Sequence, residues 1–411
     1  MSTFTDKVRF YNDRFNAQTS FFPEVEAVQH LKVSIVIPSY DEDLEEVFRS
    51  LGENSIPNAQ EIEVILILNH SETSEIKVKE KHADQAALYD KVELSNGIPV
   101  FVISAFDLPQ KKAGVGLARK IGMDVALNRF AKVNHDGLIV CLDGDCTVSI
   151  NYINEILRAE KASLNGLSIC FEHNIEKLNN EDVIKVIDYE IFLRYYIHAL
   201  RSAGYPHAFH TIGSSMASRA SAYAKIGGMN TRKAGEDFYF LHKLIPQGQF
   251  FDLTNATVYP SSRKSTRVPF GTGRAMLEME AGTKDFDTLY HPHIFRDLRE
   301  VFNRDGHKYS NFEKELPESF YKYLVEFKLL TQLQNLQQRS SGQHQFHKNF
   351  IHWMDGFKLL KFVHYCRDHM YPNLNVEEAC SQLFNIDKPD RREEVLYELR
   401  KMDRESTFSY F

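Results

Sequence analysis

The sequence has few cysteines, one tryptophan and no apolar run long enough to cross a membrane. Its 411 residues include 5 cysteines, and no two of them form a C-x-x-C pair. Neither a disulfide framework nor a structural zinc site is therefore indicated. A membrane-spanning helix needs about 20 consecutive apolar residues, and no stretch of this chain approaches that length. We expect no integral membrane segment, and the pattern leaves peripheral membrane contact open.

An excess of positive charge is also absent. Lys and Arg number 49 against 56 Asp and Glu, which gives a formal net charge of −7. Because a general nucleic-acid binder would show a basic excess, we expect no nucleic-acid partner. Residues 1–7 lack the apolar core of a signal peptide. From this we expect a cytoplasmic protein.

What the sequence does contain is enough apolar residues for a large core, arranged as alternating strands and helices. Hydrophobic residues make up 43% of the chain. Runs that are apolar on both faces are typical of parallel strands covered by helices on both sides. The predicted strands are 33–38, 63–68, 99–104 and 138–142, and helices are predicted at 43–51 and 116–128. The fold class predicted is therefore α/β, with a mainly parallel sheet.

The pattern changes toward the C-terminus, where strand signals vanish. A long helix is predicted at 182–202. After about residue 305 only helical spacing is found. The helices predicted there are 318–338, 349–368, 376–383 and 391–402. We therefore expect an all-helical C-terminal region over residues 306–411.

The most informative motif is Asp143-Gly144-Asp145, which follows the fourth predicted strand. Residues i and i+2 of an extended segment point the same way, so the two carboxylates leave the strand together. A glycine between them lets a ligand approach the backbone. Hard divalent cations prefer oxygen ligands and often bridge protein carboxylates to substrate phosphates. The alternative is a simple turn, since Asp and Gly are favoured turn residues.

Together with this motif, three further segments resemble the motifs of family 2 glycosyltransferases of the GT-A fold. The four segments, in chain order, are VSIVIPSYDE at 33–42, KAGVGLARKIG at 112–122, DGD at 143–145, and GGM at 227–229 followed by GED at 235–237. The resemblance covers residues 32–275 and implies a catalytic domain over residues 1–305. It implies a metal-dependent enzyme of hexosyltransferase type. Such an enzyme moves a sugar, with inversion, from a nucleotide-sugar donor to a carbohydrate or other acceptor hydroxyl.

The resemblance also implies roles for individual residues. Asp145 would bind Mn²⁺ or Mg²⁺, which neutralises the diphosphate leaving group, and Asp143 would contact the ribose or the metal. Asp237, with Glu236 beside it, would be the general base for the acceptor hydroxyl. The alternative for this pair is that both only place negative charge in the first turn of a helix. The residues predicted to bind the nucleotide-sugar are Pro38, Tyr40, Glu42, Asn69, Lys112, Gly116, Arg119, Asp143, Arg263 and Arg267.

Some of these residues have a second interpretation or depart from the family pattern. Glu42 lies in an acidic loop that would equally suit a solvated helix cap. Asn69 stands where the family usually has an Asp that contacts the base, so the identity of the base stays open. Arg263 and Arg267 belong to a basic, glycine-bearing segment, SSRKSTRVPFGTGR at 261–274. That segment suits a mobile loop over a diphosphate or an ordinary charged surface loop.

Several other functions fit the sequence less well. Residues 113–119 lack the third glycine of a dinucleotide-binding fingerprint. The Q-x-x-R-W motif of processive polysaccharide synthases is missing too. A sugar-phosphate nucleotidyltransferase would need a glycine-rich basic loop after the first strand. A catalytically silent scaffold that presents the helical region to a partner remains an alternative. His291 and His293 are left out of the predicted metal site, because such histidines are more often surface residues.

Overall fold

The computed structural model describes residues 3–15, 19–22, 26–90, 92–176, 178–265, 271–303, 316–387, 391–406 and 408. The chain divides into two compact units. The first consists of residues 1–177, 211–277 and 403–411, and the second of residues 178–210 and 278–402. This division differs from the boundary expected at residue 305, because residues 178–210 and 278–305 group with the helical unit. The last nine residues group instead with the unit that contains the large sheet.

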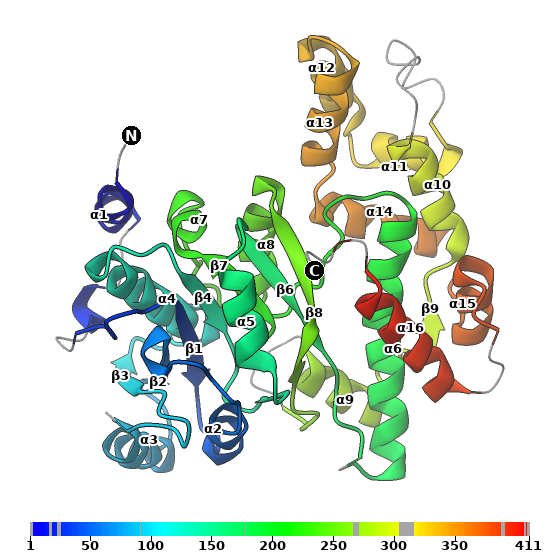
Figure 1. Ribbon diagram of the computed structural model, residues 1–411. Coiled ribbons are helices and arrows are strands. Elements are labelled where there is room, and N and C mark those ends of the chain that lie inside the picture. The colour runs from blue at the N-terminus through cyan, green and yellow to red at the C-terminus, as the bar shows by residue number, and fades with distance from the viewer. Residues whose placement is uncertain are drawn as a thin grey trace. The chain divides into compact units, whose positions relative to one another are not determined.

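An eight-stranded sheet forms the centre of the first unit, in the order β3-β2-β1-β4-β7-β6-β8-β5 (Figure 1). Four neighbouring pairs are parallel: β1 with β2, β1 with β4, β2 with β3, and β6 with β8. The strand β7 is antiparallel to both of its neighbours, and β5 is antiparallel to β8. The bounds are β1 Val33–Ser39, β2 Ile62–Ser71, β3 Val100–Leu108, β4 Leu138–Cys141, β5 Thr147–Val148, β6 Gly166–Phe171, β7 Met216–Arg219 and β8 Phe250–Tyr259. The predicted α/β class with a mainly parallel sheet is confirmed.

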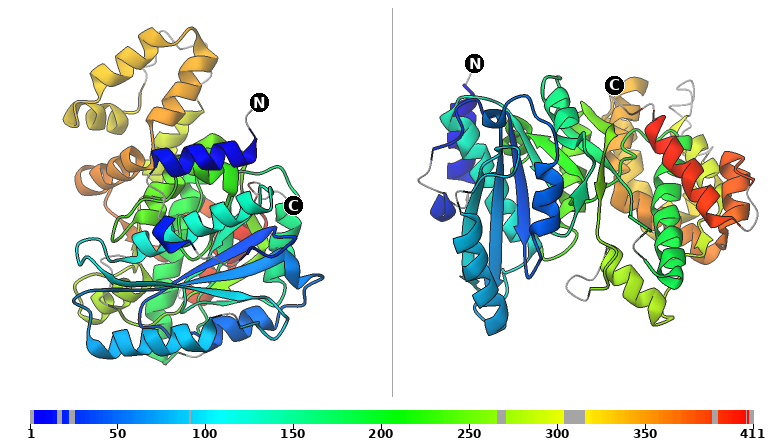
Figure 2. Two further views of the ribbon diagram at one scale, coloured as in Figure 1. Left: turned by 90° about the vertical axis from the view of Figure 1, so that its left-hand side faces the viewer. Right: turned by 60° about the horizontal axis from the view of Figure 1, so that its bottom comes forward.

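Helices cover both faces of this sheet, which explains why its strands are apolar on both sides. All residues of β1 are buried. Figure 2 shows α1 and α4 on one face and α3 on the other. On the α4 face, a β-carbon on Gly122 would collide with the side chains of Val36 and Ile67, so the helix lies directly on β1 and β2. The helices of this unit are α1 Phe4–Arg14, α2 Glu45–Gly52, α3 Ile76–Tyr89, α4 Val115–Lys132, α5 Tyr152–Glu160, α7 Ala220–Lys225, α8 Glu236–Leu244 and the first part of α9 Thr272–Glu280.

The second unit is helical, apart from a two-residue strand pair, β9 Thr288–Leu289 with β10 Leu374–Asn375. Two of the helices predicted here are divided in the structure. The prediction 318–338 becomes α11 and α12, separated at Lys328, whose φ of 55° is not helical. The prediction 349–368 becomes α13 and α14, because Asp355 starts a new helix by accepting the Lys358 N–H at 2.9 Å. The helices are α6 Asn180–Ser202, α10 Pro292–Phe302, α11 Glu318–Glu326, α12 Leu330–Arg339, α13 Gln343–Trp353, α14 Gly356–His369, α15 Val376–Phe384 and α16 Arg392–Arg404.

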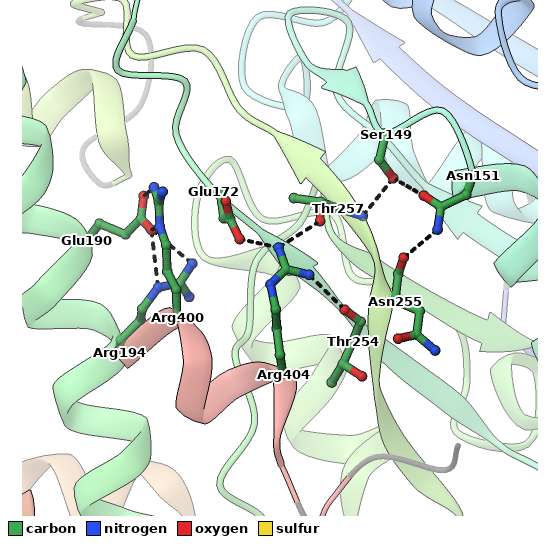
Figure 3. Close-up of polar contacts among 10 residues, drawn as sticks. All are labelled: Ser149, Asn151, Glu172, Glu190, Arg194, Thr254, Asn255, Thr257, Arg400 and Arg404. Carbon is green, nitrogen blue, oxygen red and sulfur yellow. Dashed lines mark hydrogen bonds and ion pairs between the residues drawn. The ribbon is translucent and has the colours of Figure 1, made fainter. Parts of the chain in front are cut away.

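The end of α16 returns the chain to the first unit. Arg404 donates to the Thr254 carbonyl oxygen at 3.1 Å and forms an ion pair with Glu172 (Figure 3). Beyond the helix, the backbone N–H of Asp252 in β8 donates to the Phe408 carbonyl oxygen at 3.0 Å. The C-terminal residues therefore add backbone and side-chain hydrogen bonds to the outer part of the sheet. Within the described ranges, no helix is both long and apolar enough to span a membrane.

Candidate active site

Several of the predicted site residues gather beyond the carboxyl ends of β1 and β4. These strands are parallel neighbours, so the segments that follow them leave the same edge of the sheet. Gly144 brings the two segments into contact, because a β-carbon there would lie 3.3 Å from Glu42 Cγ and 3.1 Å from Leu44 Cδ2. A larger residue at position 144 would require the side chains of Glu42 and Leu44 to shift. The glycine of the Asp-Gly-Asp motif thus has a structural reason.

Arg119 holds two of the predicted carboxylates together. Its Nη2 donates to Asp143 Oδ1 at 2.6 Å, and its Nη1 donates to Glu236 Oε1. The guanidinium comes from α4, Asp143 follows β4, and Glu236 begins α8. Arg119 is only 2% exposed, and a β-carbon on Gly213 would lie 2.6 Å from its Nη1. Arg119 thus holds Asp143 next to the start of α8.

Asp237 follows Glu236 in the first turn of α8, but its carboxylate has different partners. Asp237 Oδ1 accepts the Phe238 backbone N–H at 2.8 Å, and the Gly213 backbone N–H also hydrogen-bonds this carboxylate. Burial raises the pKa of Asp237 above its ordinary value, against the opposing charge of Arg119. Gly235 precedes the helix with a φ of 67°, a conformation that favours glycine. Of the two acidic residues, Asp237 is thus the one that Arg119 does not hold through a direct ion pair.

A second arginine, Arg263, lies between the other two carboxylates. Its Nη2 contacts Glu42 Oε1 and lies 3.1 Å from Asp145 Oδ2. The Arg263 side chain is 38% exposed, in contrast to Arg119. Burial, followed by the charges of Asp143 and Glu42, raises the pKa of Asp145 to about 6 even though Arg263 opposes the shift. Arg263 thus offsets part of the cost of charging Asp145 at this buried position.

This arrangement fits a hard divalent cation by its donor chemistry. A single guanidinium nitrogen contacts carboxylate oxygens of both Glu42 and Asp145, so these oxygens already surround a point of positive charge. Mg²⁺ and Mn²⁺ prefer such oxygen donors, and Mg²⁺ usually takes one or two carboxylates together with substrate phosphates. Across the part of the chain that is described, no three His, Cys, Asp or Glu side chains form a preassembled metal site. A cation here would need further ligands from outside this carboxylate pair.

Next to these carboxylates, two buried histidines form a pair that the sequence analysis missed. His70 Nδ1 lies 3.0 Å from His82 Nδ1, and the His70 ring stacks on Phe106 with centroids 4.5 Å apart. His82 Nε2 accepts the Asp41 backbone N–H at 3.3 Å, which ties the pair to the loop after β1. Burial, and then the charge of His70, lowers the pKa of His82 to about 4. Nothing in the sequence marks the pair, because the helix that carries His82 was not predicted.

The remaining predicted residues are spread around this site. Asn69 is buried near the end of β2, and Pro38 is buried in β1. The Tyr40 ring meets His82 edge-on, with centroids 6.1 Å apart. Lys112 is exposed in the loop before α4 and does not join the two arginine networks among the described contacts. Arg267 lies outside the described residues.

Gly116 and the two histidines that were left out of the predicted metal site lie in other settings. Gly116 is buried near the start of α4, close to Arg232. His291 and His293 lie at the start of α10 in the second unit, where each ring is 5.6 Å from that of Tyr371.

Comparisons with known proteins found similarity among solved structures only. No family model and no curated protein sequence matches the chain. The structure is similar to S. aureus TarS 1-349 in complex with UDP-GlcNAc, with a TM-score of 0.39 and 11% identity over 79% of this chain and 91% of that chain. For S. aureus TarS 1-349 in complex with UDP, the TM-score is 0.37 and the identity 12%, over 92% and 91%. Identities and TM-scores this low carry neither an activity nor a substrate over to the present chain.

Proposed function

We propose that the first unit is the catalytic domain of a metal-dependent glycosyltransferase. It would move a sugar from a nucleoside diphosphate donor to an acceptor hydroxyl with inversion of the anomeric carbon. The observation that supports this most is the meeting of three distant motifs at one sheet edge. The loop after β1 contacts Gly144, and Arg119 joins Asp143 to Glu236, the residue before Asp237. A carboxylate pair for a diphosphate-bound cation and a separate carboxylate for proton transfer are thus built on one scaffold.

Asp237 acts as the general base in this proposal. It takes the proton from the acceptor hydroxyl as that oxygen forms a bond to the anomeric carbon, while the bond to the donor phosphate breaks. Burial raises its pKa, which makes the carboxylate a stronger base than an exposed aspartate. The backbone N–H groups of Phe238 and Gly213 orient it. Glu236 cannot easily share this role, because Arg119 holds its carboxylate.

Asp145 and Glu42 hold the cation in this proposal, with Asp143 beside them. When bound, Mn²⁺ or Mg²⁺ neutralises the charge that develops on the departing nucleoside diphosphate. Arg119 keeps Asp143 from turning away, since their 2.6 Å contact is largely buried on the arginine side. The nucleoside would lie toward Asn69 and His70 near the end of β2, beside His82 of α3.

Thermal stabilisation by nucleoside diphosphates tests this function. Uridine, guanosine, cytidine and thymidine diphosphates would be added with Mn²⁺ or with a chelator to the full chain. A ligand that binds only the folded state raises the melting temperature. We expect one diphosphate to stabilise the protein more with Mn²⁺ than with chelator. Asp145→Asn should remove the metal-dependent part, whereas the exposed Asp84→Asn should not.

The same experiment separates the alternatives. A chain that no nucleotide stabilises under any condition would contradict the glycosyltransferase and support a scaffold role. If a nucleotide stabilised the protein equally with metal and with chelator, the transferase proposal would stand but its metal dependence would be rejected. Turnover of a nucleotide-sugar that carries the same nucleobase as the stabilising diphosphate then distinguishes binding from catalysis.

A further inference from the structure

The two arginines of the candidate site differ in how firmly they are held. Arg119 projects from a helix and is 2% exposed, with both terminal nitrogens donating to carboxylates. Arg263 lies between β8 and α9, where residues 260–265 form neither helix nor strand, and its side chain is 38% exposed. Its partners Glu42 and Asp145 are more buried, with side chains 10% and 29% exposed. Because solvent screens the charge of Arg263 more than that of Arg119, the contact of Arg263 is the more readily exchanged of the two.

The backbone on both sides of Arg263 is held close to the start of α9. The Arg263 N–H donates to Ser261 Oγ at 3.3 Å, and the Ser265 N–H donates to the Gly273 carbonyl oxygen at 3.1 Å. Gly273 is closely packed here, since a β-carbon on it would lie 2.9 Å from the Arg263 carbonyl oxygen. An exchange of partners by Arg263 thus requires rotation of its side chain and no movement of this backbone.

The position of the guanidinium decides what it competes with. Its Nη2 contacts oxygens of Glu42 and Asp145, the same oxygens that would hold a cation in the proposed function. A guanidinium also binds phosphate oxygens through a fork of N–H groups. Arg263 thus has two classes of partner at the same site, the carboxylates of the empty protein and the diphosphate of a donor.

We propose that Arg263 is the resting counter-ion of Glu42 and Asp145, that it gives these carboxylates up to the divalent cation of the donor complex, and that it then binds the donor diphosphate. This rests on the proposed function. The exchange predicts that Arg263 affects the binding affinities of two ligands in opposite directions. Arg263 opposes the binding of a divalent cation alone, because both need the same oxygens. It favours the binding of the nucleoside diphosphate with its cation, because its guanidinium is then free for phosphate.

Mn²⁺ binding to the full chain, measured by the electron paramagnetic resonance of free Mn²⁺, tests the first half. Arg263→Gln should bind Mn²⁺ alone roughly tenfold more tightly than the unmodified chain, as expected when a competing charge is removed. Lys264→Gln removes a neighbouring exposed positive charge and should change this affinity less than about twofold. Arg263→Lys, which keeps the charge, should resemble the unmodified chain. The melting temperatures without ligand show that each variant is folded.

Titration calorimetry of the stabilising nucleoside diphosphate, with saturating Mn²⁺, tests the second half. Here Arg263→Gln should bind roughly tenfold more weakly, and Arg263→Lys should lose part of that because it lacks the planar fork. The proposal is overturned if Arg263→Gln binds Mn²⁺ no more tightly than the unmodified chain. It is also overturned if none of the chains binds Mn²⁺. If a nucleotide still binds in either case, the proposed function survives without it. If no nucleotide binds at all, both are overturned.

Discussion

Gly116 lies so close to Arg232 that a β-carbon at position 116 would overlap the Arg232 carbonyl oxygen. Gly116 is in the first turn of α4, which carries Arg119, and Arg232 belongs to the turn that leads into α8, which starts with Glu236. A clash with backbone cannot be relieved by rotating a side chain. The absence of a side chain at Gly116 therefore sets the distance across which Arg119 reaches Glu236.

Gly116→Ala should consequently destabilise the first unit and weaken the site. Extra volume at a packed position costs about 1–3 kcal/mol, which urea denaturation would measure as a lower midpoint. Nucleoside diphosphate stabilisation should fall as well, because α4 and α8 move apart. Gly342→Ala is the matched control, since a β-carbon there meets nothing within 4 Å. An unchanged midpoint for Gly116→Ala would mean that the turn at Arg232 yields freely.

Replacing the carboxylates of Asp237 and Glu236 by uncharged amides should affect different properties, turnover for Asp237 and stability for Glu236. Asp237→Asn keeps an oxygen for the Phe238 N–H but cannot take a proton. It should lower kcat by about 10²–10⁴-fold with little change in donor affinity. Glu236→Gln removes one of the two carboxylates that pair with the buried guanidinium of Arg119. Removal of a buried ionic partner costs up to about 3–5 kcal/mol of folding free energy. Turnover and urea denaturation of both variants would show the contrast.

Other outcomes for these two variants would change which residue is assigned as the general base. If Glu236→Gln lost turnover at unchanged stability, Glu236 would be the base and Asp237 its companion. If Asp237→Asn retained turnover, a different group would accept the proton. Donor affinity measured beside kcat keeps a loss of catalysis distinct from a loss of binding.

The buried histidine pair should make the first unit less stable in acid. Burial lowers the pKa of His82 from 6.5 to about 4, so the unfolded chain takes up a proton at higher pH than the folded one. The stability that His82 contributes is therefore complete above pH 6.5 and is lost as the pH falls from 6.5 to about 4. The lowered pKa of His70, again mainly from burial, acts in the same direction.

Melting temperatures across this pH range would measure the effect. His82→Gln should show a shallower loss of stability with falling pH, because the variant has no proton to take up at this position. His347→Gln changes an exposed histidine of α13 and should keep the slope of the unmodified chain. An equal slope in all three chains would assign the acid sensitivity to other groups.

The sequence predicts this fold best where the pattern is local. The strand predicted at 33–38 is β1, Val33–Ser39, because a buried parallel strand needs apolar residues on both faces. The prediction of one continuous helix at 318–338 was wrong, because the chain turns at Lys328, which has a positive φ, between α11 and α12. Helical spacing of apolar residues does not reveal such a turn. The division into units was also beyond the sequence pattern, since α6, which ends at Ser202, groups with helices from α10 onward, which begin at Pro292.

The candidate site shows the same limit. The motif spacing predicted the aspartates and the E-D pair, and the structure places Glu42, Asp143 and Asp145 at one sheet edge. Which arginine holds which carboxylate was not predictable, because Arg263 and Glu42 are 221 residues apart. Side-chain pairing at that separation depends on the loops between the strands, and no local pattern encodes it.

Two arginines one turn apart on α16 should act on different units. Arg400 donates to Glu190 at 2.7 and 3.1 Å, beside Arg194, in the second unit, and Arg404 binds Thr254 and Glu172 in the first (Figure 3). Because Glu190 is 0% exposed, Arg400→Ala should cost on the order of 1–3 kcal/mol and raise hydrogen exchange in α6. The Arg404 side chain is 44% exposed, so Arg404→Ala should cost less than about 1 kcal/mol and raise exchange in β8 instead. Peptide-level exchange that rose in β8 for Arg400→Ala, or in α6 for Arg404→Ala, would contradict this assignment of each arginine to its own partners.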